Sequence, residues 1–442
     1  MEPATTRSLS LAERVRRARR TGLTFGRIYL GIKTNQLIER HVRPPDMKRR
    51  WSAFNRSSAR SIYETAVELR GLILKGCQFM GSRADVLPPE YVEVLSKLQD
   101  RVPAQGFPVV RRTVERELGA PLDQVFSCFS ETPLASASLA QVHEARLLDG
   151  RRVAVKVQYP EIAALVRSDL ANLRALFRAV GLLERNLDLM PLIDELATYV
   201  PRELDFVNEG RNAETVAGHF EGRADVVVPG VIWEHTTRRV LVMEFMEGIK
   251  ITDVEALRAA GVDLPRVAEL LVEAFCEQIL SRGFFHADPH PGNLLVQPEG
   301  PRLVLLDFGL AKDLPPGFRE GVVNFAAALL LGETGRMARA LLDLGFETRE
   351  GGEAALHEIA EVILRVGQEL RARSGLDPET VARLRDEIPE RVRANPIVRI
   401  PHHLVLLGRV IGLLSGVSSS LGVRIDFVRV IAPYALGSRP AP

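Results

Sequence analysis

The N-terminal part of the chain has a helical pattern of apolar and polar positions. Residues 10–60 are predicted to form basic helical segments, broken at Gly22, at Gly26 and at the Pro44–Pro45 pair. From Ser58 to Lys75 the pattern becomes amphipathic, and the apolar residues near helical spacing are Ile62, Ala66, Leu69, Leu72 and Ile73. Another short helix is expected after Pro88–Pro89, ending before Pro103.

The pattern changes near residue 108 and indicates a small sheet. After a short helix over Val109–Leu118, residues 133–147 are typical of an extended segment. Asp149–Gly150 predicts a tight turn, and residues 151–159 then predict an apolar strand. The sequence therefore places a β-hairpin in the middle of this region.

Helices dominate the rest of the chain. Long helical stretches are expected over residues 160–187 and 192–219, followed by a strand pair formed by residues 226–234 and 239–245. From Leu257 onward nearly everything is expected to be helical, apart from Phe284–Phe308. The predicted fold is α+β, with domain divisions near residues 105 and 248.

Composition and charge narrow the class of protein. With 442 residues, 46% hydrophobic and 26% charged, the chain is globular and is not disordered as a whole. Its three cysteines lack a CxxC spacing, which argues against a disulfide scaffold or a structural zinc site and fits a reducing compartment. No secretory signal is visible at the N-terminus, and we expect a cytoplasmic protein.

The net charge of +2 is unevenly distributed. Residues 1–60 carry 15 Lys and Arg residues against four acidic residues, a formal charge of +11, while the remainder sums to −9. Such a basic arm favours an anionic lipid surface or a nucleic acid, although a solvated arginine-rich helix would have the same composition. Five of these arginines crowd into two helical turns: Arg14, Arg16, Arg17, Arg19 and Arg20.

One apolar segment approaches the length of a membrane span. Leu404–Val423 contains Arg409 and the run Ser418–Ser420, which are costly in hydrocarbon. A helix packed within a folded lobe explains this segment better than a membrane span. Any membrane association is therefore expected to be peripheral.

The densest polar cluster in an apolar setting is His286-Ala287-Asp288-Pro289-His290-Pro291-Gly292-Asn293. It is followed, after a strand-like run, by Asp307-Phe308-Gly309. Carboxylate and amide oxygens in this order suit Mg²⁺ together with nucleotide phosphates. In the protein-kinase arrangement, Asp288 would act as the base, and Asn293 and Asp307 would bind metal.

Two further residues complete a kinase-like set. Lys156, in Val153-Ala154-Val155-Lys156, follows the Asp-Gly turn on the strand that holds the phosphates in kinases. Glu209, in a helical stretch, is available as its ion-pair partner. The order, spacing and local structure of these residues together predict a protein-kinase-like bilobal fold.

Some features depart from ordinary protein kinases, and a metallohydrolase is an alternative to a kinase. The loop expected over the phosphates contains Ala135, Ser136, Ala137 and Ser138 and no glycine. The segment after Asp307-Phe308-Gly309 is expected to be too short for a long activation loop, and no APE sequence appears. The alternating His286, Asp288 and His290 also suit a metallohydrolase, which would need a second cluster of ligands.

The sequence resembles the UbiB/AarF/ADCK family of atypical kinase-like proteins over roughly residues 60–430. The segments that carry the resemblance are LILKGCQFMGSRADVLPPEYVEVLSKLQD, PLASASLAQVH, VAVKVQYP, ELDFVNEGRN, FFHADPHPGN and LDFGL. The KxGQ sequence of the family is altered here, because Gly76 stands second and Cys77 third. Ser136 and Ala140 likewise stand where Ala and Gly are usual.

The resemblance implies an ATP-binding, Mg²⁺-dependent protein acting at a membrane surface in quinone or isoprenoid-lipid biosynthesis. Together with the charge asymmetry and the domain divisions, it predicts a basic arm (residues 1–60), a helical extension (61–104), a small lobe (105–248) and a helical lobe (249–435). Lys75 and Gln78 of the extension would approach Glu203 and Asp205 and keep protein substrates out. The implied nucleotide contacts are Lys156, Ala135, Ser136, Ala137, Ser138, Glu244 and Met246.

Two alternatives stay open. One is a small-molecule phosphotransferase of the aminoglycoside or choline kinase type, which has a similar HxDxxxxN loop but lacks the extension. The other is a nucleotide-binding pseudokinase scaffold without turnover. No nucleic-acid partner is expected, and the expected activity is closer to ATP hydrolysis than to protein phosphorylation.

Overall fold

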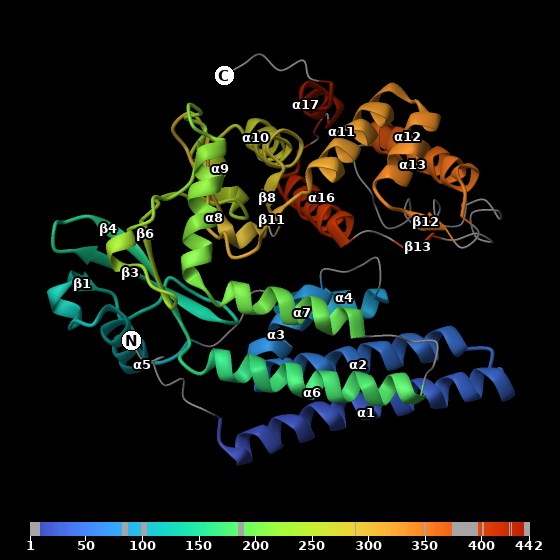
Figure 1. Ribbon diagram of the computed structural model, residues 1–442, viewed down its shortest axis with the longest axis horizontal. Helices are drawn as coiled ribbons and strands as arrows, with labels where there is room; N and C mark the ends of the chain where they lie inside the picture. The colour runs from blue at the N-terminus through green and yellow to red at the C-terminus, as the bar shows by residue number, and fades with distance from the viewer. Residues whose placement is uncertain are drawn as a thin grey trace. The chain divides into compact units, whose positions relative to one another are not determined.

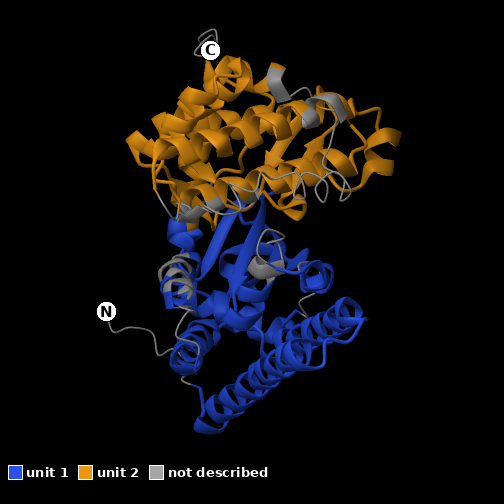
Figure 2. Cartoon of the chain, turned by 90° about the vertical axis from the view of Figure 1, so that its right-hand side faces the viewer, with its two compact units in different colours: residues 1–208, 231–245 blue, residues 209–230, 246–442 orange. Residues whose placement is uncertain are grey.

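The computed structural model describes residues 9–81, 87–98, 104–183, 190–287, 289–348, 351–373, 397–399, 402–423, 425 and 427–436. The chain forms two compact units, coloured separately in Figure 2. Unit 1 comprises residues 1–208 and 231–245, and unit 2 comprises residues 209–230 and 246–442. The boundary crosses helix α8 (Phe206–His219), and each unit is described by itself below.

Unit 1 begins with a helical hairpin of α1 (Leu11–His41) and α2 (Met47–Leu69), shown in blue in Figure 1. The expected break at Pro44–Pro45 lies between the two helices. The breaks expected at Gly22 and Gly26 were wrong, because α1 runs through both residues. A glycine inside a helix costs about 1 kcal/mol, which packing against neighbouring helices can offset.

Close packing explains another glycine of α1. A Cβ atom on Gly31 would overlap the ring of Phe54 on α2, so the two helices approach closely at this point. The buried face of α1 is polar, since Arg17, Thr21, Thr24 and Asn35 are buried. Thr24 bonds Thr65 of α2 with 2.9 Å between their hydroxyl oxygens, which satisfies both groups inside the hairpin.

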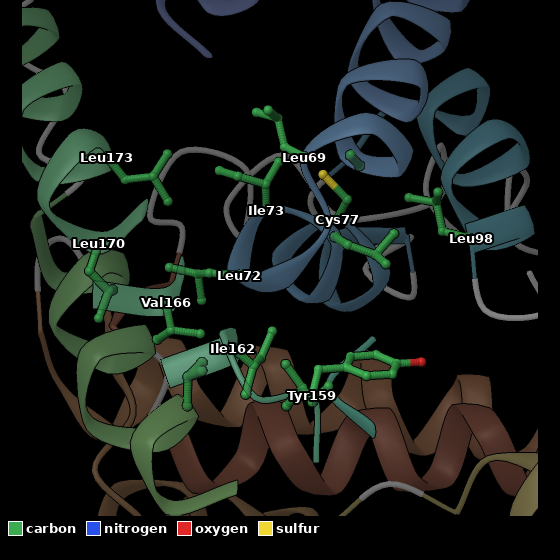
Figure 3. Packing of buried hydrophobic residues seen from close by; sticks show 14 of the residues in the cluster. Leu69, Leu72, Ile73, Cys77, Leu98, Tyr159, Ile162, Val166, Leu170 and Leu173 are labelled. Carbon is green, nitrogen blue, oxygen red and sulfur yellow. The ribbon is translucent and has the colours of Figure 1, made fainter. Parts of the chain in front are cut away.

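The amphipathic stretch expected over residues 58–75 is divided between two helices. Helix α2 ends at Leu69, and α3 (Gly71–Gly81) begins after Arg70. The backbone φ of Arg70 is 53°, which is unusual for a residue other than glycine. The predicted apolar positions of this stretch, except the half-buried Ile62, are buried in one cluster with residues of later helices (Figure 3). Helices α4 (Pro89–Leu95) and η1 (Ser96–Leu98) add to the same cluster.

A five-stranded antiparallel sheet forms the other part of unit 1. Its order is β1-β3-β4-β6, with β2 pairing on β3. The strands are β1 (Phe126–Phe129), β2 (Ala135–Ser136), β3 (Ala140–Leu147), β4 (Arg152–Gln158) and β6 (Val240–Glu244). The predicted hairpin at Asp149–Gly150 joins β3 to β4, and Gly150 has φ of 90°, a conformation that favours glycine.

Alternation along β4 directs its side chains to two faces. Val153, Val155 and Val157 are buried in a core shared with α5 (Phe107–Leu118) and η2 (Leu122–Gln124). Because successive strand residues point to opposite faces, Lys156 lies on the other face of the sheet. The short helix η3 (Trp233–His235) precedes β6.

Three helices follow β4 in the sequence. They are α6 (Ile162–Leu183), α7 (Met190–Glu203) and α8. The single helix expected over residues 192–219 was therefore wrong, because the helix is interrupted at Leu204–Asp205. The Asp205 carboxylate accepts the Val207 backbone N–H at 3.2 Å and begins α8, as short polar side chains do at helix N-termini.

The strand pair expected from residues 226–234 and 239–245 was mostly wrong. Strand β5 (Val226–Val227) runs parallel to β10 (Arg302–Leu305) in a sheet of unit 2. Only an isolated bridge between Val231 and Met243 matches the predicted pairing within the described residues. The proline and glycine at positions 229 and 230 explain the interruption, because neither favours a continuous strand.

Unit 2 contains short strands and many helices. The sheet with β10 has the order β5-β10-β9-β7, where β7 is Ile249–Lys250 and β9 is Leu294–Gln297. Strand β8 (Phe284–His286) pairs with β11 (Ala311–Asp313), and β12 (Glu347–Thr348) with β13 (Ile397–Arg399). The helices are α9 (Val254–Ala259), α10 (Leu264–Cys276), η4 (Glu277–Arg282), η5 (Pro291–Asn293), α11 (Pro316–Leu331), α12 (Thr334–Asp343), α13 (Glu353–Arg373), α16 (His402–Ser420) and α17 (Phe427–Ala435).

The segment weighed as a membrane span falls largely on α16. Leu406, Leu407, Val410 and Leu414 are buried on one side of this helix, as expected for packing within a lobe. Among the described residues, no helix combines the length and apolar character that crossing a bilayer requires. The division into arm, extension, small lobe and helical lobe stays a prediction.

Candidate functional site

Lys156 lies in the middle of the small sheet. It stands opposite Val142 on β3 and Leu241 on β6, so both neighbouring strands hold its backbone. Its Nζ lies 5.3 Å from the centre of the Phe206 ring, at the start of α8. Lys156 is thus a half-buried cation on a well-fixed strand, not a mobile surface lysine.

The alanine–serine loop, residues 135–138, consists of the short strand β2 and the first residues of its tight connection to β3. The Ala137 N–H donates to the Ala140 carbonyl at 2.8 Å, which closes the turn. The Ser136 hydroxyl lies 2.8 Å from the Tyr159 hydroxyl, and the Tyr159 N–H donates to the Leu139 carbonyl at 3.0 Å. Tyr159, to which the sequence analysis gave no role, therefore holds this loop at two points.

A buried hydrogen-bonded chain supports the same hairpin. The Gln141 amide lies 2.9 Å from His143 Nε2, and His143 Nδ1 lies 2.7 Å from the Ser130 carbonyl. Since a carbonyl only accepts, Nδ1 carries the proton and Nε2 accepts from the amide. Burial lowers the pKa of His143, which agrees with a neutral ring in this tautomer.

Lys75 of α3 meets Glu203 at the end of α7, as the family resemblance implies. Lys75 Nζ lies 3.1 Å from Glu203 Oε1, and the Glu203 side chain is only 9% exposed. Asp205 pairs instead with Arg238 at 3.2 Å and begins α8. Gln78 lies on α3, but its side chain falls outside the described part of the structure.

In unit 2, Glu209 lies beside the Asp307-Phe308-Gly309 segment. A Cβ atom on Gly309 would lie 3.3 Å from Asp307 Oδ1 and 3.7 Å from Glu209 Oε2, so glycine lets the two carboxylates approach. The Asn212 amide donates to the Phe308 carbonyl at 2.9 Å and fixes α8 to this segment. The role of Asn212 was not predicted from the sequence. Its spacing of three residues from Glu209, which puts both side chains on one face of the helix, could have indicated it.

His286 is buried at the start of the His286–Asn293 segment. It is 1% exposed, its N–H donates to Gln278 Oε1 at 3.0 Å, and its ring centre lies 5.9 Å from that of Phe308. The neighbouring Ala287 N–H donates to the Leu310 carbonyl at 2.7 Å. His286 therefore joins this loop to the segment of Asp307, while Asp288 lies outside the described residues.

Asn293 and Asp307 are brought together by strand pairing. Leu294 stands opposite Leu305 in the β9–β10 pair, and the Leu306 N–H donates to the Asn293 carbonyl at 3.0 Å. Asn293 directly precedes β9, and Asp307 follows shortly after the end of β10. Their backbones are therefore neighbours at the same edge of the strand pair. Asp307 Oδ1 accepts the Gly309 N–H at 3.0 Å, which orients its carboxylate. An amide oxygen and a carboxylate are ligand types that the hard, oxygen-preferring Mg²⁺ ion binds.

The remaining predicted residues lie at the end of β6 and beyond DFG. Glu244 is the exposed last residue of β6, opposite Val153, and Met246 is half-buried and begins a stretch of unit 2. Helix α11 begins at Pro316, shortly after β11, so the expected short post-DFG segment is present. The described residues contain no group of three or more His, Cys, Asp and Glu side chains suited to a metal ion.

These groups and the fold define a kinase-like protein of atypical architecture, with an N-terminal helical region. The model of the ABC1 atypical kinase-like domain matches residues 97–341. The chain belongs to this ABC1/AarF family, which confirms the resemblance to the UbiB/AarF/ADCK proteins.

Curated relatives match most of the chain. The chain is 33% identical over 408 residues to the chloroplastic protein ACTIVITY OF BC1 COMPLEX KINASE 8 of Arabidopsis thaliana, covering 86% of this chain and 54% of the relative. It is 34% identical over 379 residues to AarF domain-containing protein kinase 1 of Xenopus tropicalis, covering 83% and 71%. The chain thus spans about half the length of the plant relative.

A solved structure shares the fold. It is the complex of Rv3197 with erythromycin from Mycobacterium tuberculosis, with a TM-score of 0.63 and 24% sequence identity. The match covers 85% of this chain and 94% of that one. At this identity the likeness concerns the fold alone.

Proposed function

We propose that this protein binds ATP with Mg²⁺ and hydrolyses it slowly, coupled to a quinone or isoprenoid-lipid pathway at a membrane surface. The observation that carries the ATP part is the strand pairing that makes the backbones of Asn293 and Asp307 neighbours, with Glu209 and Asp307 both close to Gly309. Phosphoryl transfer depends mainly on positioning and charge neutralisation, so such a set of groups is the main requirement.

Each group has a defined role in this proposal. Lys156 holds the α- and β-phosphates, and Glu209 pairs with it and orients it. Asn293 and Asp307 hold Mg²⁺, which neutralises phosphate charge when bound. Asp288 orients a water molecule and accepts its proton while the bond between the γ-phosphorus and the bridging oxygen breaks. Residues 135–138, Glu244 and Met246 contact the nucleotide.

The Lys75–Glu203 contact supports this proposal over a small-molecule phosphotransferase. Glu203 is nearly buried, and a buried carboxylate without a counter-ion is energetically costly. The ion pair with Lys75 therefore holds the extension helix α3 to α7. A small-molecule phosphotransferase of the aminoglycoside or choline type has no such extension. Against a pseudokinase scaffold, Lys156, Glu209, Asn293 and Asp307 are all present.

ATP hydrolysis with and without liposomes tests the proposal. We expect Mg²⁺-dependent phosphate release that rises when liposomes with anionic lipid are added. Neutral phosphatidylcholine liposomes serve as the control. Phosphate release that is absent under all of these conditions would favour the scaffold alternative.

The exposed face of α1 supports a membrane-surface partner. Its largest exposed apolar residues are Leu11, Val15, Leu23, Leu30 and Leu37. At 3.6 residues per turn they lie opposite the buried polar face and alongside the exposed Arg16, Arg19, Arg27 and Arg40. Leucines flanked by arginines suit an interface with anionic lipid. Arg17, which was counted in the basic arm, is buried and is not available to lipid.

We therefore expect Leu30→Glu to weaken binding to anionic liposomes by about tenfold or more, because it removes an inserted apolar group and adds repulsion. Flotation at increasing salt measures this, and wild-type binding should weaken with ionic strength. Leu148→Glu is the matched control, since Leu148 is 63% exposed and Leu30 is 65% exposed. Equal binding of the two variants would show that α1 is not the contact surface.

A further inference from the structure

A buried ion pair joins the first helix to the rest of unit 1. Arg17 of α1 is 4% exposed and Asp169 of α6 is 1% exposed. Arg17 Nε donates to Asp169 Oδ1 at 2.9 Å, and Nη2 donates to Oδ2 at 2.6 Å. This two-pronged geometry fixes both side chains, unlike a pair on the surface.

Both members of the pair also hold the junction between α2 and α3. The Arg17 guanidinium donates from Nη1 to the Leu69 carbonyl and from Nη2 to the Arg70 carbonyl, at 3.5 Å for the latter. Burial raises the pKa of the Asp169 carboxyl, and Arg17 together with the backbone N–H groups of Leu72 and Ile73 opposes this rise. The pair therefore lies between the carbonyls that end α2, which Arg17 satisfies, and the first turn of α3.

The junction itself leaves little freedom. Arg70 and Gly71 both have positive φ, 53° and 63°. A Cβ atom on Gly71 would lie 3.5 Å from Asp169 Oδ2 and 3.7 Å from Arg17 Nη2, so the chain turns directly against the ion pair. The turn from which α3 begins therefore lies directly against Arg17 and Asp169.

Helix α3 carries this placement to two parts of the candidate site. Lys75, in its second turn, meets Glu203 at 3.1 Å. Its apolar side, with Leu72, Ile73 and Cys77, packs in one buried cluster with Tyr159 (Figure 3). Leu139 belongs to the same cluster. Those last two residues hold the alanine–serine loop through the contacts described above. One helix thus touches both the Lys75–Glu203 contact and the support of the loop.

We propose that Arg17 and Asp169 are positioning residues, which set α3 so that Lys75 reaches Glu203 and the alanine–serine loop keeps its shape. The first helix thereby adjusts nucleotide binding without touching the nucleotide. The placement of α3 stands on the contacts alone, whereas the effect on nucleotide rests on the proposed function.

Hydrogen exchange of the full-length protein tests the placement. In Arg17→Met and Asp169→Asn, exchange of the α3 amides should rise about tenfold or more, while the β4 and α10 amides stay unchanged. Arg17→Lys keeps the charge but not the fork, and should restore part of the protection. Arg19→Met is the matched control, because Arg19 is exposed on the same helix. Gly71→Ala strains the junction without altering charge and should raise the exchange of the α3 amides in the same way. This variant keeps the test possible if Arg17→Met does not fold.

A double-mutant cycle with Lys75→Met tests the link to nucleotide. Arg17→Met should change the dissociation constant for Mg·ADP by about fivefold or more, and this change should largely vanish in the Lys75→Met background. Unchanged α3 exchange in Arg17→Met, Asp169→Asn and Gly71→Ala would overturn the placement. Raised exchange with fully additive effects on Mg·ADP would overturn the link to nucleotide. If the wild type binds no Mg·ADP, the proposed function fails, while the exchange data still decide the placement.

Discussion

Asp307→Asn is expected to abolish the Mg²⁺-dependent stabilisation of this protein by ATP or ADP, while the fold survives. At a ligand concentration of 100 times the dissociation constant, binding stabilises the wild type by about 2.7 kcal/mol, and this gain should disappear. The physical reason is that an amide cannot supply the negative charge that a divalent cation needs beside Asn293. An asparagine oxygen can still accept the Gly309 N–H, so the local backbone should hold.

Thermal unfolding with Mg²⁺, with EDTA and with each nucleotide measures this effect. Asp313→Asn is the matched control, because Asp313 is an exposed carboxylate on β11, shortly after the DFG segment. The control should respond to Mg·ADP as the wild type does. Metal-dependent stabilisation that persists in Asp307→Asn would remove the metal role assigned to Asp307.

Glu209→Gln should lower the rate of ATP hydrolysis by about 10²- to 10³-fold, the range seen when one preorganised charged or polar group is lost from an active site. Glu209 is 2% exposed and its carboxylate lies beside Gly309, so we expect the substitution to act within this site. Without it, the proposed partner Lys156 loses the charge that orients it toward the phosphates. Lys156→Met should lower the rate by a similar factor.

The double variant distinguishes a working pair from two independent effects. If Lys156 and Glu209 act through one ion pair, Lys156→Met together with Glu209→Gln should be little worse than either change alone. Glu214→Gln is the matched control, since Glu214 is exposed on the same helix. Multiplied losses in the double variant would contradict the pairing.

Most of the kinase-like residues and their order could be predicted from the sequence, because they lie in short segments. The turn and strand signals of these segments are strong. The Asp149–Gly150 turn fixed the register that puts Lys156 on a central strand. The strand-like residues before Asp307 likewise predicted its approach to Asn293, which the β9–β10 pairing produces. Such local signals need no knowledge of distant parts of the chain.

Features that depend on distant contacts could not be predicted in the same way. The glycines of α1 suggested helix breaks. However, α2 and α6 pack along this helix, and this packing keeps it helical at both glycines. Strand β5 was assigned to its neighbour in sequence, whereas its partner β10 comes much later in the chain. Arg17 looked like one of five surface arginines, because only the fold brings Asp169 beside it.

Titration calorimetry of ATP into the wild-type protein tests whether the nucleotide site exists. With MgCl₂ we expect a single site with a dissociation constant in the micromolar range, and binding at least about tenfold weaker when EDTA replaces the metal. No heat of binding at millimolar ATP, or equal affinity with and without Mg²⁺, would contradict a nucleotide site built on Asn293 and Asp307.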